Sequence, residues 1–266
     1  DVASLPRVTS SILDHGLSPA QIDAAVSAAS LDRRPLYMVD GALLAQLRPD
    51  LIVTQGVCAV CAVTESTVRQ SLQWAPVHEV SSARVLSLEG IDWSGIRHDL
   101  AALASAAGQP GRAEALVATL DRRWARLDDA RPSSPPTVAM LEWPDPPWFG
   151  GHWVPQQVAV AGGRDLFGQA GRPSGRLSWE QLREADPDYV IGIACGFDLS
   201  RNRTHLSAAV TGPLAGLRAV AEGRVWAADA NALFSRPGPR VVDGAEVLQQ
   251  IFTGRPVSPQ QAVVLG

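Results

Sequence analysis

The sequence contains no lysine, because all 23 of its basic residues are arginine. This absence excludes Schiff-base chemistry and the lysine of a phosphate-binding P-loop. The patterns G-x-G-x-x-G and G-x-S-x-G are missing as well, so neither a dinucleotide-binding turn nor the nucleophile turn of a hydrolase is indicated. An enzyme is therefore the less favoured function for this chain.

Long apolar runs and an excess of basic charge are also absent. No run approaches the roughly 20 apolar residues that span a bilayer, so we expect no membrane insertion. The net charge of −4 argues against a nucleic-acid partner, which requires a strongly basic face. The first residues, Asp1-Val2-Ala3-Ser4, show neither an initiator Met nor a signal peptide. Export after removal of a leader and a cytoplasmic location both stay open.

Cysteine is scarce, and the three thiols are an odd number, which excludes a fully paired disulfide framework. Cys58 and Cys61 follow a predicted strand at residues 50–54, and Cys195 follows a predicted strand at 188–193. Together with His152 these thiols are candidate ligands of a soft metal ion. A redox disulfide between Cys58 and Cys61, or plain packed thiols, are the alternatives. One Cys-x-x-Cys pair does not decide among them.

Residues 142–155 hold three of the eight tryptophans, four prolines and two adjacent glycines. This composition predicts a stiff aromatic loop instead of a helix or a central strand. The loop follows a predicted strand at 137–141, and α/β sheets bind ligands beyond the carboxyl ends of their strands. We expect contact with a flat or bulky ligand, although tryptophans that only cover a core are the alternative. The candidate ligand contacts, including those from a facing proline-rich loop, are Trp143, Trp148, Phe149, His152, Trp153, Phe234 and Arg236.

Predicted strands and helices alternate in two halves, which indicates α/β structure with parallel pairing. Ser18 and Pro19 predict the start of a helix in the first half. Residues 44–53 and 182–191 repeat one helix-Pro-Asp-strand unit. Residues 96–130 are predicted to be helical, with one interruption at 108–111. We therefore expect an N-terminal lobe at 1–95, a connecting helix at 96–130 and a C-terminal lobe at 137–266.

Six segments carry a resemblance to a known family, and they occur in its order: 47–53 (LRPDLIV), 145–151 (DPPWFGG), 160–167 (VAGGRDLF), 178–182 (SWEQL), 221–226 (AEGRVW) and 236–240 (RPGPR). The chain resembles the helix-linked, class III periplasmic binding proteins of ABC importers, most closely those that bind cobalamin and other corrinoids. The resemblance implies two Rossmann-like lobes joined by a long helix, with a ligand cleft between the lobes. It also implies an exported protein that needs no cofactor and binds a large metal chelate. A corrinoid is the first choice, and haem or a ferric siderophore is the alternative.

The resemblance carries further expectations for partners and ligands. A strand and helix that usually open the first lobe have no counterpart here. A glutamate that docks the permease on the second lobe matches Glu180, whereas its first-lobe equivalent falls at Gly41, beside Asp40. If the lobes face each other as in the family, a cysteine thiol or His152 is placed to bind the metal of a corrinoid. An enzyme that uses Cys58, Cys61, Cys195 and His152 on the same scaffold is the alternative.

Overall fold

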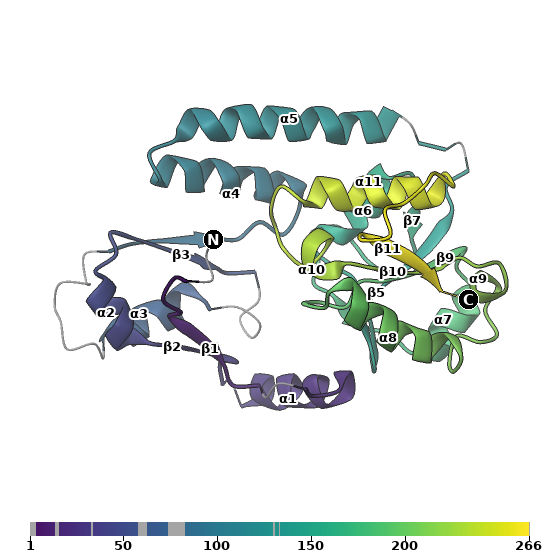
Figure 1. The fold of residues 1–266 in the computed structure, drawn as a ribbon, viewed down its shortest axis with the longest axis horizontal. Helices are drawn as coiled ribbons and strands as arrows, with labels where there is room; N and C mark the ends of the chain where they lie inside the picture. Colours follow the sequence, from purple (N-terminus) through teal and green to yellow (C-terminus); the bar gives the residue numbers. More distant parts are fainter. Residues whose placement is uncertain are drawn as a thin grey trace. The chain divides into compact units, whose positions relative to one another are not determined.

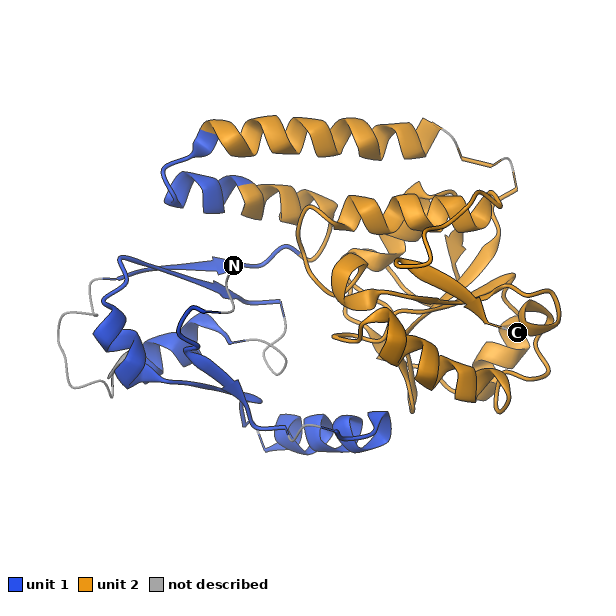
Figure 2. Cartoon of the chain, viewed as in Figure 1, with its two compact units in different colours: residues 1–90, 101–110 blue, residues 91–100, 111–266 orange. Residues whose placement is uncertain are grey.

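The protein, seen in a computed structural model, is described for residues 4–13, 16–32, 34–57, 63–73, 83–129, 131–132 and 134–265. It consists of two compact units (Figure 2). Unit 1 comprises residues 1–90 and 101–110, and unit 2 comprises residues 91–100 and 111–266. The helical segment predicted to connect the lobes is therefore shared between the units.

Unit 1 contains two small sheets. Strand β1 (Thr9–Ser11) pairs antiparallel with β2 (Tyr37–Val39), and β3 (Leu51–Gln55) pairs parallel with β4 (Arg84–Leu88). The helices described within residues 1–90 are α1 (Pro19–Leu31), α2 (Gly41–Leu47) and α3 (Glu65–Gln73). The parallel pairing of β3 and β4 agrees with the βαβ pattern of the sequence, because parallel neighbours need a crossover connection.

Unit 2 is built on a seven-stranded mixed sheet with the strand order β11-β10-β9-β5-β6-β8, and β7 pairs beside β5 (Figure 1). Its strands are β5 (Thr137–Pro144), β6 (Pro147–Phe149), β7 (Arg164–Asp165), β8 (Gly175–Arg176), β9 (Tyr189–Gly192), β10 (Val225–Ala228) and β11 (Ala262–Leu265). Strands β5, β9 and β10 run parallel to one another. Their carboxyl ends therefore lie along one edge of the sheet, which we call the carboxyl edge.

Helices cover both faces of this sheet (Figure 1). They are α6 (Val154–Val160), α7 (Trp179–Ala185), α8 (Leu199–Val210), α9 (Arg218–Ala221), α10 (Ala230–Leu233) and α11 (Val241–Phe252). Alternate residues of β5 divide between the two layers, because side chains along a strand point to opposite faces. Val138 and Met140 join the core with α6 and α11, whereas Ala139 and Leu141 join the core with α8.

The predicted helical segment forms two helices, α4 (Trp93–Ala106) and α5 (Pro110–Asp129), and the chain reverses at the predicted interruption. The indole rings of Trp93 and Trp124 stack with centroids 4.9 Å apart. Arg97 Nη1 lies 3.0 Å from Asp121 Oδ2. The first half of α4 therefore packs along α5, and Trp93 is part of the core of unit 2.

Candidate functional site

The aromatic segment is a β-hairpin, and the prediction of a loop was wrong at this point. Strands β5 and β6 pair antiparallel with Trp143 opposite Trp148 and Pro144 opposite Pro147. The turn contains a cis peptide bond before Pro146. The two paired prolines sit at the closed end of the hairpin, where the strand ladder stops and needs no further N–H donors. The hairpin thus extends the sheet at the carboxyl edge and places two tryptophans there.

Both hairpin tryptophans are partly exposed and have defined contacts. The ring of Trp143 packs against Phe197, with centroids 5.1 Å apart and planes tilted by 57°. The guanidinium carbon of Arg176 lies 5.3 Å from the centre of the Trp148 ring, at cation–π distance. Phe149 is also partly exposed, and the centroid of its ring lies 6.5 Å from that of the Phe167 ring. The rings are therefore held in place and still reach the surface.

His152 lies on a tight turn that follows the hairpin. Its backbone has φ of 55°, in the left-handed region, and its N–H donates to the carbonyl of Arg172 at 2.6 Å. Glu142 Oε2 accepts from the Gly151 N–H at 3.3 Å and from the Ser174 hydroxyl at 2.7 Å. A side chain at Gly151 would overlap the backbone of residues 172–174, so this close approach requires glycine. Burial lowers the pKa of His152 below its ordinary value.

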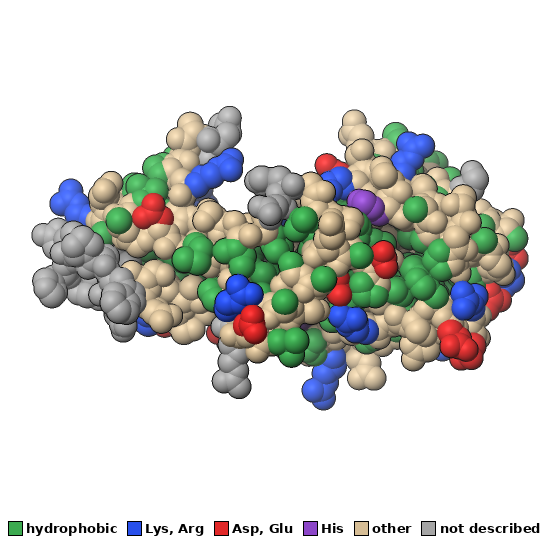
Figure 3. Space-filling view, turned by 90° about the horizontal axis from the view of Figure 1, so that it is seen from below, with side chains coloured by type: hydrophobic (Ala, Val, Ile, Leu, Met, Phe, Trp, Pro, Cys, Tyr) green, Lys and Arg blue, Asp and Glu red, His purple; other side chains and the backbone are tan. Residues whose placement is uncertain are grey.

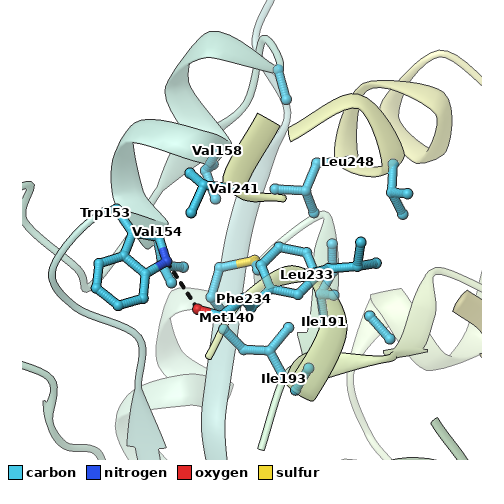
Figure 4. Close-up of a cluster of buried hydrophobic side chains, with 14 of the residues drawn as sticks. Met140, Trp153, Val154, Val158, Ile191, Ile193, Leu233, Phe234, Val241 and Leu248 are labelled. Carbon is cyan, nitrogen blue, oxygen red and sulfur yellow. Dashed lines mark hydrogen bonds between the residues drawn. The ribbon is translucent and has the colours of Figure 1, made fainter. Parts of the chain in front are cut away.

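Trp153 and Phe234, two of the predicted ligand contacts, lie in the core of unit 2. Trp153 is 5% exposed and Phe234 is 2% exposed. The indole Nε1–H of Trp153 donates to the carbonyl oxygen of Phe234 at 2.9 Å (Figure 4). Both side chains pack with Met140 and Val158 against the sheet. The turn at His152 directs the next residue inward, and a buried indole needs a hydrogen-bond acceptor, which Phe234 supplies.

Cys195 and Arg236 are exposed at the carboxyl edge. The Cys195 N–H donates to the carbonyl of Glu142 at 3.1 Å, which places the thiol residue beside the hairpin. Arg236 Nη2 donates to Asn231 Oδ1 at 3.1 Å, and the Asn231 N–H donates to the carbonyl of Phe197 at 2.9 Å. The structure therefore brings the neighbourhoods of Trp143, Cys195 and Arg236 to one edge of unit 2.

Cys58 and Cys61 lie outside the described residues, so the predicted set of three thiols and His152 is not tested. Among the residues that the structure does describe, no group of three or more His, Cys, Asp or Glu side chains is arranged to hold a metal ion. The thiol-rich metal site stays a prediction.

Sequence reasoning missed a polar side chain that organises the carboxyl edge. Asn202 is 2% exposed, and its Nδ2 donates to the carbonyls of Gly192 at 2.9 Å and Ala228 at 2.8 Å. These carbonyls end β9 and β10, so one amide from α8 links two neighbouring strand ends. Phe197 is another buried residue that sequence reasoning missed, and its ring packs against the ring of Trp143. Asn202 lies four residues after Asp198, which caps the start of α8, and this spacing alone does not predict a buried amide.

The two predicted permease-docking residues occupy helix starts. Glu180 is exposed in the first turn of α7, which Ser178 and Gln181 cap reciprocally. Asp40 is exposed and caps α2, because its Oδ1 accepts from the Leu43 N–H at 2.9 Å. Glu180 has no ion-pair partner in the described part of the chain. Asp40, in contrast, has a structural role as a helix cap.

The face shown in Figure 3 mixes arginine and acidic side chains with apolar ones, without a continuous basic field. None of the described helices combines the length and apolar character that crossing a membrane requires. Aromatic side chains at the carboxyl edge of an α/β sheet lie where such folds place their ligands.

Comparison with known proteins is consistent with this class. A family model described as "Periplasmic binding protein" matches residues 42–232, well over half of the chain. The chain belongs to the periplasmic binding protein family. No curated protein matches it.

Solved structures of similar fold include three substrate-binding proteins. An ABC transporter substrate-binding protein from Listeria monocytogenes has a TM-score of 0.67 at 15% identity, covering 82% of this chain and 81% of that one. A periplasmic haem-binding protein from Pseudomonas aeruginosa has a TM-score of 0.67 at 21% identity, covering 86% and 81%. The periplasmic vitamin B12 binding protein of Vibrio cholerae has a TM-score of 0.60 at 20% identity, covering 81% and 78%. These likenesses establish the helix-linked fold.

Proposed function

We propose that this protein binds a large metal chelate, most favourably cobalamin or another corrinoid. The observation that carries the proposal is the pair Trp143 and Trp148, opposed across a hairpin at the carboxyl edge of unit 2 and still partly exposed. Aromatic rings fixed in this way offer a large contact area at a small entropic cost. Such a surface suits a broad, flat ligand better than a small polar one.

The side chains around these rings fit a metal-centred ligand. His152 is half-buried on a rigid turn, and its lowered pKa keeps the imidazole neutral at neutral pH, the form that binds metals. Cys195 is an exposed thiol on the neighbouring loop. We propose Trp143, Trp148, Phe149, His152, Cys195 and Arg236 as ligand contacts in unit 2, and Cys58, outside the described residues, stays a proposed contact. Trp153 and Phe234 support them from the core.

We further propose that the chain works outside the cytoplasm and delivers its ligand to an ABC importer. Membership of the periplasmic binding protein family supports both parts of this proposal. The exposed Glu180 is the proposed contact for a permease arginine on unit 2, and Asp40 is its proposed counterpart on unit 1. We also propose that the chain functions as two lobes, residues 1–95 and 137–266, joined by the connecting segment 96–130.

A binding titration with cobalamin, cobinamide, haem and a ferric siderophore, followed by absorbance, tests the ligand class. We expect saturable binding of a corrinoid with one ligand per chain. Tighter binding of haem or the siderophore would identify that chelate, instead of a corrinoid, as the ligand. Stoichiometric zinc in the purified protein, without affinity for any chelate, would favour the enzyme that uses Cys58, Cys61, Cys195 and His152.

The same titration identifies an axial ligand. If His152 binds the cobalt, His152→Gln shifts the visible spectrum of the complex, and the wild-type spectrum changes as the imidazole becomes protonated at acidic pH. Cys195→Ser serves as the matched test of the thiol. Spectra that stay the same in both variants would remove these two residues as metal ligands while leaving the aromatic contacts in place.

A further inference from the structure

Two arginines at the carboxyl edge are anchored on a single residue, Phe197. The guanidinium carbon of Arg201 lies 4.1 Å from the centre of the Phe197 ring, a close cation–π contact. Arg236 is held through Asn231, whose N–H donates to the Phe197 carbonyl at 2.9 Å while its Oδ1 accepts from Arg236 at 3.1 Å. The ring orients one cation and the backbone of the same residue orients the other.

Neither arginine has a carboxylate partner in the described part of the chain, although both are exposed. The nearest acidic residues along the chain have other roles. Asp198 caps α8 by accepting from the Arg201 N–H at 2.8 Å, and Asp229 caps α10 by accepting from the Ala232 N–H at 3.0 Å. Elsewhere in unit 2 arginines do form ion pairs, as Arg123 does with Asp243 and Glu246.

The positive charge of Arg201 acts on its surroundings. Burial is the main cause of the lowered pKa of His205, and the charge of Arg201 adds to it. His205 packs on the Phe197 ring at 5.3 Å, so the cation, the ring and the imidazole form one cluster. The net charge of the chain is −4, and the face in Figure 3 shows no broad basic field. Arg201 and Arg236 are therefore local, oriented cations.

Resting on the function proposed above, we infer that Arg201 and Arg236 bind anionic groups on the rim of the ligand, so that the preferred chelate carries peripheral carboxylates or a phosphate. A guanidinium presents paired N–H donors that match such oxyanions. Trp143 also packs on Phe197, so the stacking surface and both cations share one support. A flat chelate stacked on Trp143 has its rim close to the two arginines.

The test compares corrinoids that differ in their periphery: cobyrinic acid with carboxylate side chains, cobalamin with a phosphodiester, and cobinamide with neutral amides and no phosphate. We expect cobyrinic acid to bind at least about tenfold tighter than cobinamide at low salt, with cobalamin between them. This advantage should shrink in about 0.5 M NaCl, because salt screens exposed charges. Haem and its dimethyl ester form an equivalent pair if haem is the better ligand.

Variants assign the preference to these residues. The double variant Arg201→Gln/Arg236→Gln should bind cobyrinic acid and cobinamide with nearly equal affinity. Phe197→Leu keeps the backbone anchor of Arg236 and removes the ring on which Arg201, Trp143 and His205 pack, so it should lose part of the preference. Arg203→Gln changes the same charge on the same helix, without a contact to Phe197, and should keep the full preference.

The outcomes separate this inference from the function on which it rests. Equal binding of anionic and neutral corrinoids by the wild type, or a preference that survives in the double variant, would overturn the inference while the chelate-binding function stands. Failure of every chelate to bind would overturn both.

Discussion

The ring of Trp143 packs against the ring of Phe197 at 5.1 Å, whereas Trp153, ten residues further along, is buried and hydrogen-bonded to the backbone of Phe234. Two tryptophans of one short segment thus have opposite roles. Trp143 stays partly exposed at the carboxyl edge, and Trp153 links the start of α6 to the end of α10.

This difference predicts that substitution of Trp153 lowers mainly stability and that substitution of Trp143 lowers mainly ligand affinity. Trp153→Phe leaves the Phe234 carbonyl without its donor, and we expect a loss of about 1–3 kcal/mol in the free energy of unfolding with nearly unchanged ligand affinity. Trp143→Leu removes an aromatic face at the surface, and we expect about tenfold weaker chelate binding at a cost in stability of about 1 kcal/mol or less. Urea denaturation and absorbance titration of both variants measure the two effects. The opposite pattern would mean that Trp143 is structural and Trp153 contacts the ligand.

Asn202 should control the order of the carboxyl edge. Asn202→Leu keeps the size of the side chain and removes the donor shared by the Gly192 and Ala228 carbonyls. We expect a loss of about 2–4 kcal/mol in the free energy of unfolding, because each buried acceptor without a partner costs about 1–3 kcal/mol. Hydrogen exchange of the amides at 194–197 should also become faster. Thr204→Ala, an exposed change on the same helix, is the control, and equal exchange rates in both variants would contradict this role.

Arg123 should anchor α5 to α11. Its Nε and Nη2 lie 2.8 Å and 2.6 Å from Glu246, and Nη2 lies 2.5 Å from Asp243. The hydrogen bonds that the guanidinium donates to both carboxylates raise its pKa further above its already high value. Arg123→Met leaves two carboxylates without their cation, and we expect a loss of about 1–2 kcal/mol in the free energy of unfolding.

The control for this anchor is Arg126→Met, on the same helix. Arg126 has no ion-pair partner in the described part of unit 2, so its substitution should change stability by less than about 0.5 kcal/mol. In about 1 M NaCl the difference between wild type and Arg123→Met should narrow, because salt screens partly exposed pairs. A difference independent of salt would indicate that packing of the side-chain stem, and not charge, holds the helices together.

Much of the fold was predictable because local rules and tertiary structure agree. The prediction that Ser18 and Pro19 begin a helix is confirmed, since Ser18 and Gln21 form a capping box at the start of α1. The run at residues 50–54 predicted a strand of the kind found in parallel sheets, and β3 lies there, parallel to β4. In both cases the signal lies within a few neighbouring residues, and no distant contact opposes it.

The candidate site was less predictable because it depends on the directions in which side chains point and on contacts between residues that are far apart in the sequence. Proline content argued against strands at 142–155, but Pro144 and Pro147 occupy the end of the hairpin, where missing donors cost little. Trp143 and Trp153 look equivalent in sequence, and only the left-handed turn at His152 sends the second ring inward. The roles of Phe197 and Asn202 arise from contacts across the sheet, and such contacts leave no local pattern in a single sequence.

Acid should weaken unit 2 through Asp188. The Thr137 N–H donates to Asp188 Oδ2 at 2.7 Å, and this bond, the Thr137 hydroxyl and Arg218 lower the pKa of the carboxyl to about 2. The pKa of an Asp side chain in an unfolded chain is about 3.9. Because the folded state holds the proton more weakly, the stabilisation is complete above about pH 4 and is lost as the pH falls towards 2.

The Asp188→Asn variant removes this titration. The side chain of Asp188 is 27% exposed, so screening reduces the contribution, and we expect about 1 kcal/mol at neutral pH. The difference in unfolding free energy between wild type and variant should shrink between pH 4 and pH 2, as measured by urea denaturation at each pH. A wild-type advantage that persists at pH 2 would show that the geometry of Thr137 and Arg218, and not the charge of the carboxylate, stabilises this corner of the sheet.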